Sequence, residues 1–186
     1  MAYENILDIT SRAEFREWLD LHSQTEKECY VCAVRGRPVD DDRLWYIDAV
    51  EEALCFGWID STLRTIDGKR MQRFSPRRKN SNWTELNKER VRRLEKLGLM
   101  TDAGRAVLPP MGDFLMDAEI ESILREAGVW TTFISFHPLY QRVRISNLLF
   151  YRERDRSSYE KALGHLIEET SEGRMFGDWN DYGRLL

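Results

Sequence analysis

The chain has 186 residues, of which 42% are hydrophobic and 32% are charged, and its formal net charge is −4. This composition is typical of a folded protein, and no window approaches the ~18 consecutive apolar residues of a membrane-spanning helix, so disordered and membrane-spanning classes are excluded. The first residues lack the basic and apolar regions of a secretory signal, so we expect a cytoplasmic protein with no transmembrane segment.

The first 57 residues predict strand, helix, strand and helix in that order. Residues 4–9 form a short strand candidate, and Thr10 or Ser11 then caps a helix whose capping box is completed by Glu14. The aromatic and β-branched run 29–36 predicts a second strand. We expect this run to lead, through a turn, into the second helix.

The second helix has a clear apolar stripe. Its members recur at steps of three, three and four residues, which is the spacing of a core-facing helix: Leu44, Ile47, Val50 and Leu54. Residues 40–42, three aspartates, supply its predicted N-terminal cap, and Gly57 is placed where helices end in a left-handed residue.

The three cysteines do not indicate a disulfide framework or a metal site. Cys29 and Cys32 lie three apart in the predicted strand, where such residues point to opposite faces, and Cys55 lies alone near the end of a helix. A zinc site needs a full set of convergent ligands. We therefore expect no cofactor and no metal.

The strongest local signal is a hairpin over residues 58–75. Two strand-like runs flank Asp67-Gly68, the dipeptide favoured in two-residue hairpin turns. That turn pairs Asp60 with Ser75 and makes Asp60 a diagonal neighbour of Arg73 on one face. We therefore expect Asp60 to orient Arg73.

After the hairpin the pattern becomes helical. Asn82, with Glu85 three residues later, predicts a helix start, and Pro109-Pro110 is the best candidate boundary. We expect an α+β fold: a small sheet with the 58–75 hairpin packed by helices, in a domain over residues 1–108. Residues 111–186 form an all-helical segment packed on that domain as one compact unit.

Positive charge is concentrated in one stretch of this acidic chain. Residues 64–96 contain twelve Lys or Arg against four acids, a local charge of +8, while the remainder carries −12. Guanidinium groups suit phosphate or carboxylate, and tryptophans stack on planar ligands. The predicted anion-binding surface of the hairpin and its following loop comprises Trp58, Asp60, Arg64, Arg73, Arg77, Arg78, Lys79 and Trp83.

Three other interpretations remain open. The basic residues form a solvated surface, with Trp58 and Trp83 in the core. An enzyme acting on a small anionic substrate would use Asp60 as acid or base. A nucleic-acid-binding protein would combine the basic loop with the helix face that carries Lys88, Arg92 and Lys96.

The run from residue 51 to residue 104 resembles the YdeI/OmpD-associated family, also labelled bacteriocin-protection proteins. The similar stretches are "EEALCFGWIDS", "QRFSPRRKNSNWTELNKERV" and "GLMTDAGRA", in order and at compatible spacing. Where that family tends to carry Lys-Arg-x-Glu-Thr-Arg, this chain has "YRERDRSS". The resemblance implies a binding or stress-resistance role, a location sometimes presumed periplasmic, and no agreed catalytic residue.

These observations favour a non-enzymatic binding protein whose partner is a small anionic ligand or another protein, with nucleic acid the less favoured choice. Arg73 and Arg77 are its expected main contacts, and Asp60 its expected orienting group. Whether the chain catalyses a reaction is left open at this point.

Overall fold

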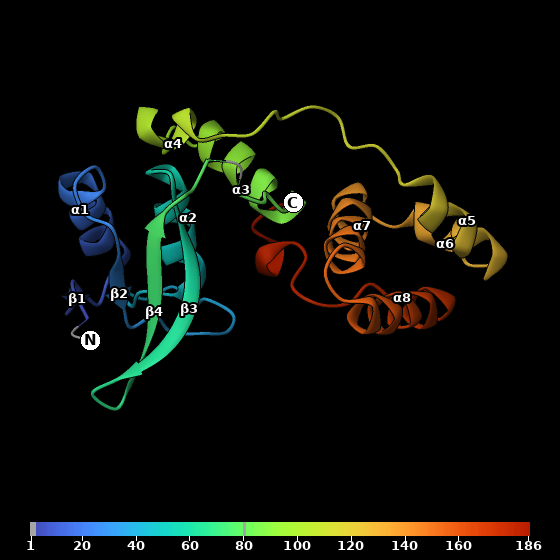
Figure 1. Ribbon diagram of the computed structural model, residues 1–186, viewed down its shortest axis with the longest axis horizontal. Coiled ribbons are helices and arrows are strands. Elements are labelled where there is room, and N and C mark those ends of the chain that lie inside the picture. The colour runs from blue at the N-terminus through green and yellow to red at the C-terminus, as the bar shows by residue number, and fades with distance from the viewer. Residues whose placement is uncertain (1–2, 80) are drawn as a thin grey trace. The chain divides into compact units, whose positions relative to one another are not determined.

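The computed structural model describes residues 3–79 and 81–186, and the α+β fold class is confirmed (Figure 1). The chain divides into two compact units. Unit 1 comprises residues 1–82 and 90–110, and unit 2 comprises residues 83–89 and 111–186. The expected packing of the C-terminal helices on the N-terminal part as one compact unit stays a prediction.

Unit 1 contains a four-stranded mixed sheet in the order β1-β2-β4-β3. Strand β1 (Ile6–Leu7) runs parallel to β2 (Cys29–Val31), which is antiparallel to β4 (Lys69–Pro76). Strand β3 (Trp58–Ile66) is antiparallel to β4 and forms the predicted hairpin with it, and Asp67 and Gly68 both take positive φ at the turn. The second strand is shorter than predicted, since only three residues of the 29–36 run pair in the ladder.

Helix α1 (Arg12–His22) begins as predicted. Ser11 accepts a hydrogen bond from the Glu14 backbone, and the Glu14 carboxylate accepts from the Ser11 backbone at 2.9 Å, which completes the capping box. Phe15 and Leu19 are fully buried, and the Phe15 ring lies 5.3 Å from that of Phe74 in β4. The helix therefore packs its apolar stripe against the sheet.

Helix α2 (Tyr46–Cys55) starts differently from the prediction. Its N-cap is Trp45, which makes no side-chain cap hydrogen bond, so the predicted cap over residues 40–42 is wrong. Asp41 instead accepts from the Arg43 guanidinium at 2.7 Å and from the Trp45 indole at 2.8 Å. These carboxylate contacts form a local loop structure before the helix begins.

The predicted stripe of α2 is buried in full, and Gly57 ends the helix with φ +76° as expected. The helix also buries residues that its stripe did not include, because Asp48, Glu51 and Glu52 are at most 6% exposed. Helix α2 contacts α1, β3 and the short helix α4 (Asp102–Ala106) and is therefore surrounded on more than one side.

Arginines compensate the buried acids of α2. Arg12 donates to Asp48 at 3.0 Å, to Glu51 at 2.9 Å and to Glu52 at 2.5 Å. Arg16 donates to Glu52 at 2.7 Å, and Arg93 donates to Glu51 at 2.9 Å. Because buried carboxylates are costly unless they are paired, this ionic network is what allows an acidic helix to occupy the core.

Helix α3 (Glu85–Lys96) supplies Arg93 to this network, and its residues are divided between the two units. It begins later than the predicted cap at Asn82, because Thr84 Oγ1 accepts the Asn87 backbone N–H at 3.2 Å and takes the capping role. The short helix α4 (Asp102–Ala106) packs against the end of α2, and its cap residue Thr101 donates a 2.6 Å hydrogen bond to the Cys55 carbonyl.

Unit 2 is helical. It contains α5 (Ala118–Glu126), α6 (Trp130–Ser135), α7 (Pro138–Arg152), α8 (Arg156–Ser171) and a short 3-10 helix, Asp181–Gly183. Its core includes Phe133 and Tyr140, both fully buried. The C-terminal tail docks by its aromatics, as Trp179 packs edge-on against Tyr140 at 5.7 Å.

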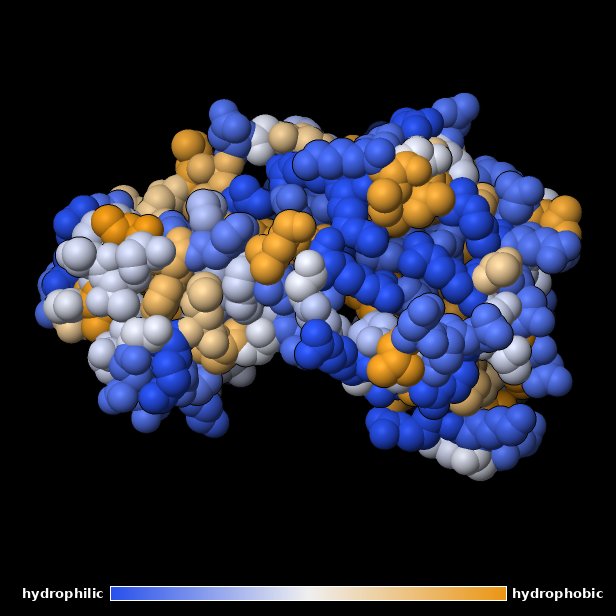
Figure 2. Space-filling view, turned by 180° about the vertical axis from the view of Figure 1, so that it is seen from behind, coloured by the Kyte–Doolittle hydropathy of each residue, from blue (hydrophilic) through white to orange (hydrophobic). Residues whose placement is uncertain are grey.

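On the face drawn in Figure 2, hydrophilic side chains predominate and hydrophobic residues form small separate patches. Scattered exposed apolar side chains such as Leu21 and Leu115 are normal for a folded protein. Among the described helices, none combines the length and apolarity needed to cross a bilayer.

Candidate functional site

A β-bulge in the hairpin decides which predicted site residues share a face. From the turn to Leu63 the register agrees with the prediction, with Ile66 opposite Lys69 and Arg64 opposite Met71. Between Asp60 and Leu63 the register shifts, so that two β3 residues oppose the single residue Arg73. Asp60 consequently stands opposite Phe74, and the predicted pairing of Asp60 with Ser75 is wrong.

The sheet therefore has two faces with different residues from those expected. The core face carries Phe74 and Cys29, which pair across β2 and β4 and are fully buried, and Asp60 joins them beyond the bulge. The outer face carries a small cluster of buried residues, Tyr30, Ile66 and Met71. Alternation along the strands places Arg64 and Arg73 on this outer face.

Asp60 does not orient Arg73. Its carboxylate accepts a 2.6 Å hydrogen bond from the Tyr46 hydroxyl of α2. Burial raises the pKa of Tyr46 well above its usual range, and the charge and hydrogen bond of Asp60 act in the same direction. The phenol thus stays protonated, and Asp60 joins the hairpin to the helix.

Arg73 has partners of its own on the outer face. Its guanidinium donates to Glu28 at 2.6 Å and to the Ser61 hydroxyl at 3.0 Å. Since Glu28 neutralises it, Arg73 is less suited to be the main contact of an anion than the sequence suggested.

Arg77 is buried in the loop that follows the hairpin. It donates to Ser81 Oγ at 3.3 Å and to the Asn82 carbonyl at 3.2 Å. Burial lowers the pKa of Arg77 to about 10, and the charge of Asp60 opposes that shift. Arg77 therefore shapes its own loop, while Arg78 and Lys79 are exposed beside it.

The two tryptophans of the predicted surface lie in different settings. Trp58 is 1% exposed, packs edge-on against Trp18 and donates to the Ser23 carbonyl at 3.0 Å, so it is a core residue and cannot stack on a ligand. Trp83 is half-buried and belongs to unit 2.

Two arginines that do not belong to the predicted anion-binding surface lie together at the core face near the hairpin turn. Arg35 and Arg70, with Ala33 and Leu63, line a hollow of about 220 Å³. The Arg35 guanidinium donates to Gln72 Oε1 at 2.7 Å and stacks over the Tyr46 ring at 4.1 Å. Gln72 is the sequence signal that could have indicated this hollow, because a glutamine that is buried in a strand next to arginines needs polar partners.

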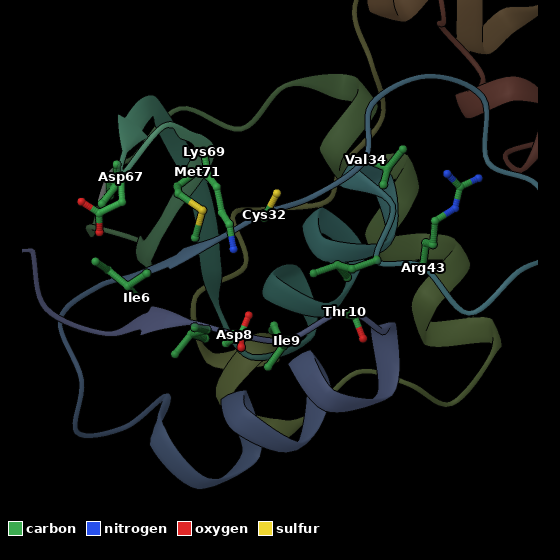
Figure 3. Close-up of a pocket in the computed structure, with 13 residues that line it drawn as sticks. Ile6, Asp8, Ile9, Thr10, Cys32, Val34, Arg43, Asp67, Lys69 and Met71 are labelled. Carbon is green, nitrogen blue, oxygen red and sulfur yellow. The ribbon is translucent and has the colours of Figure 1, made fainter.

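A larger pocket lies on the side of the outer-face cluster (Figure 3). Its volume is about 520 Å³, and its lining combines apolar side chains with a few charged ones. Ile66 and Met71 come from the hairpin, and residues 6–10 contribute strand β1 and the segment after it. Figure 3 shows the Lys69 side chain between the Met71 and Cys32 side chains, with its ammonium group directed toward the side of the pocket where Asp8 lies.

The family comparison matches residues 7–107 to the family described as Domain of unknown function (DUF8412). Because this segment covers more than half of the 186 residues, the chain belongs to that family. No curated protein and no solved structure matches the chain.

The expected membership of the YdeI/OmpD-associated family is therefore wrong. The motifs behind that resemblance, residues 51–104, fall inside the segment that the DUF8412 model matches. In the structure several motif residues have structural roles, since Glu51 and Glu52 belong to the buried ionic network and Trp58 to the core. Side chains that serve packing and ion pairing indicate the fold rather than an activity.

Proposed function

We propose that unit 1 is a non-enzymatic binding module for a compact anion, held between Arg35 and Arg70. The observation that carries this proposal is that two guanidiniums line one hollow without a carboxylate to neutralise them. Within residues 3–79 and 81–186, neither has an acidic side chain at ion-pair distance.

The position of Arg35 supports the proposal because the side chain is already held in place. Its contacts with Gln72 and with the Tyr46 ring fix the plane of the guanidinium. A guanidinium has five N–H donors, and Gln72 Oε1 accepts only one of those of Arg35, so several donors stay available for a ligand. A donor that is fixed before binding loses less entropy when the ligand arrives.

Among the described residues, the neighbouring acid Asp60 is not at ion-pair distance from either guanidinium. Asp60 accepts the Tyr46 hydroxyl at 2.6 Å, and its charge also acts on the buried Arg77. Asp60 therefore positions Tyr46, and Tyr46 in turn supports Arg35 through the stacked ring. This chain of contacts gives Asp60 an orienting role toward a different arginine from the one predicted.

The size of the hollow selects the class of ligand. At about 220 Å³ it is smaller than the ~300–1,000 Å³ typical of sites for larger organic ligands. Guanidinium pairs bind phosphate and carboxylate oxygens through parallel hydrogen bonds. The favoured ligand is therefore inorganic phosphate, a phosphate monoester or a small dicarboxylate.

The test is a thermal-shift titration at constant ionic strength with phosphate, AMP, succinate and a short DNA duplex. Arg35→Ala and Arg70→Ala remove the proposed contacts. Arg64→Ala is the matched control, because Arg64 is an exposed arginine of the same hairpin on the outer face. A ligand that binds only the folded state raises the melting temperature by mass action.

We expect one small anion to stabilise the wild type and the Arg64→Ala variant but neither of the other two. Loss of the shift in all three variants would indicate unspecific attraction to the basic hairpin and contradict the site. A shift with the DNA duplex alone that falls steeply with salt would instead favour the nucleic-acid interpretation.

A further inference from the structure

We infer that the 520 Å³ pocket of Figure 3 is a second, separate ligand site, which takes a small molecule with an apolar body and a single carboxylate. This site is independent of the Arg35–Arg70 hollow. Alternation along β4 puts Lys69 and Met71 on one face of the hairpin and Arg70 on the other.

The volume and the lining of the pocket define the body of the ligand. The volume falls within the ~300–1,000 Å³ range of small-molecule sites. Much of the lining consists of aliphatic side chains and a thioether, and burying apolar ligand surface against them is favourable because that surface is removed from water. A ligand that is polar all round would lose hydration there without hydrogen bonds to replace it.

Lys69 defines the charged end of the ligand. Among the described residues no carboxylate lies within ion-pair distance of its ammonium group. The other cation of the lining, Arg43, already donates to Asp41 at 2.7 Å and stacks over Trp45. Lys69 is therefore the cation of the pocket lining that we expect to pair with a carboxylate of the ligand.

Two acids restrict the ligand to a single negative charge. Asp8 and Asp67 line the same pocket, and Figure 3 shows the Asp8 carboxylate on the opposite side of the pocket from the hairpin strands. Their charges repel a polyanion such as a nucleotide or inorganic phosphate. A monocarboxylate that places its head group at Lys69 and its apolar body over Met71 and Ile66 satisfies both conditions.

Cys32 provides a direct reporter of occupancy. It is exposed and lines this pocket, whereas Cys29 and Cys55 are buried. A ligand that fills the pocket covers the Cys32 thiol, so it slows alkylation by iodoacetamide, which intact-mass spectrometry follows on the full chain.

The experiment titrates the protein with octanoate and measures binding by calorimetry and by the Cys32 alkylation rate. Octylammonium has the same apolar body with the opposite charge, and inorganic phosphate has charge without an apolar body. The variants are Lys69→Met, which removes the charge, and Cys32→Trp, which fills the pocket. Lys27→Met is the matched control, because Lys27 is also exposed but does not line the pocket.

We expect octanoate to bind the wild type and Lys27→Met and to protect Cys32 in both. Lys69→Met should bind about tenfold more weakly, a loss of about 1.4 kcal/mol, because it removes the charge-assisted hydrogen bond to the carboxylate. Cys32→Trp should not bind, and octylammonium and phosphate should give neither heat nor protection. Arg70→Ala should bind octanoate normally, which separates this site from the compact-anion site.

Three results would overturn the inference. They are absence of octanoate binding to the wild type, equal binding by Lys69→Met, and equal protection by octylammonium. Lys69 and Cys32 are exposed side chains, so both variants should melt as the wild type does. A variant that melts normally but keeps full affinity would show that octanoate binds elsewhere.

Discussion

The Tyr46 hydroxyl and the Asp60 carboxylate, which are joined by a 2.6 Å hydrogen bond, connect helix α2 to strand β3. The same tyrosine ring lies beneath the Arg35 guanidinium at 4.1 Å. A bulge of one residue in the hairpin is what turns Asp60 toward Tyr46 and away from Arg73. The pairing of helix and hairpin thus determines which arginine is supported at the proposed anion site.

Tyr46→Phe should destabilise unit 1 by about 1–3 kcal/mol, because Asp60 would keep its half-buried carboxylate and lose its donor. Urea unfolding followed by far-UV circular dichroism measures this loss. The double variant Tyr46→Phe, Asp60→Asn should recover part of it, since the unpaired charge is then gone. A single variant as stable as the wild type would contradict the structural role of the pair.

Glu51→Gln should cost about 3 kcal/mol, because the buried carboxylate accepts from both Arg12 and Arg93. Arg93 would then lose its carboxylate partner, whereas Arg12 would keep Asp48 and Glu52. Glu95→Gln is the matched control. Glu95 pairs with Arg105 at 2.8 Å on the surface, where solvent screens the two charges and such pairs contribute little to stability. Chemical denaturation of both variants compares the two sites, and equal costs would argue against burial as the cause.

Gly104→Ala should destabilise the junction of α4 and α2. A Cβ at this position would lie 2.7 Å from the Cys55 carbonyl carbon, so the two backbones would have to separate. Gly164→Ala is the control in helix α8, where a Cβ meets nothing within 4 Å. That change should stabilise its helix by up to about 1 kcal/mol, the usual gain of alanine over glycine. Melting temperatures that move in opposite directions would verify the close approach.

Alkylation of the native protein near pH 8 should modify one cysteine, Cys32, with Cys29 and Cys55 reacting only after unfolding. Burial raises the pKa of Cys55 to about 11, with the charge of Glu52 acting in the same direction, so its thiol stays protonated at that pH. Peptide mapping identifies the modified residue. Rapid modification of Cys55 in the folded chain would show that helix α2 opens locally.

The same burial makes stability depend on pH. The Cys55 thiol ionises near its ordinary pKa of 9 in the unfolded chain and only near 11 in the folded one. The unfolded state therefore loses the Cys55 proton first as the pH rises. Between about pH 9 and 11 this lowers the free energy of unfolding by ~1.4 kcal/mol for each pH unit. Cys55→Ala should show a shallower alkaline decline in the free energy of unfolding.

Local features of the structure were predictable from the sequence because residues close together in the chain determine them. The capping box of Ser11 and Glu14, the Asp67-Gly68 turn and the left-handed Gly57 all follow from short-range hydrogen bonds and backbone sterics. The buried stripe of α2 followed from helical spacing. From these features the α+β class and the hairpin were predictable.

The candidate site was only partly predictable, because its geometry depends on residues far apart in the chain. The residues next to Asp60 in the sequence do not predict the bulge. A shift of one residue in the register places every side chain beyond the bulge on the other face of the sheet. Similarly, Asp41 was expected to cap a helix and instead holds Arg43 and Trp45 in a loop. Local patterns cannot choose between such competing partners.

The sequence by itself determined where helices and strands form, because those preferences are set within a few residues by backbone hydrogen bonding and apolar spacing. Only the tertiary structure decided which charges are neutralised. Arg12 finds its carboxylates 36 to 40 positions along the chain, and Arg73 finds Glu28 at a separation of 45. Among the residues that the structure describes, no acid lies at ion-pair distance from Arg35 or Lys69, because electrostatic pairing depends on distance in space rather than in sequence.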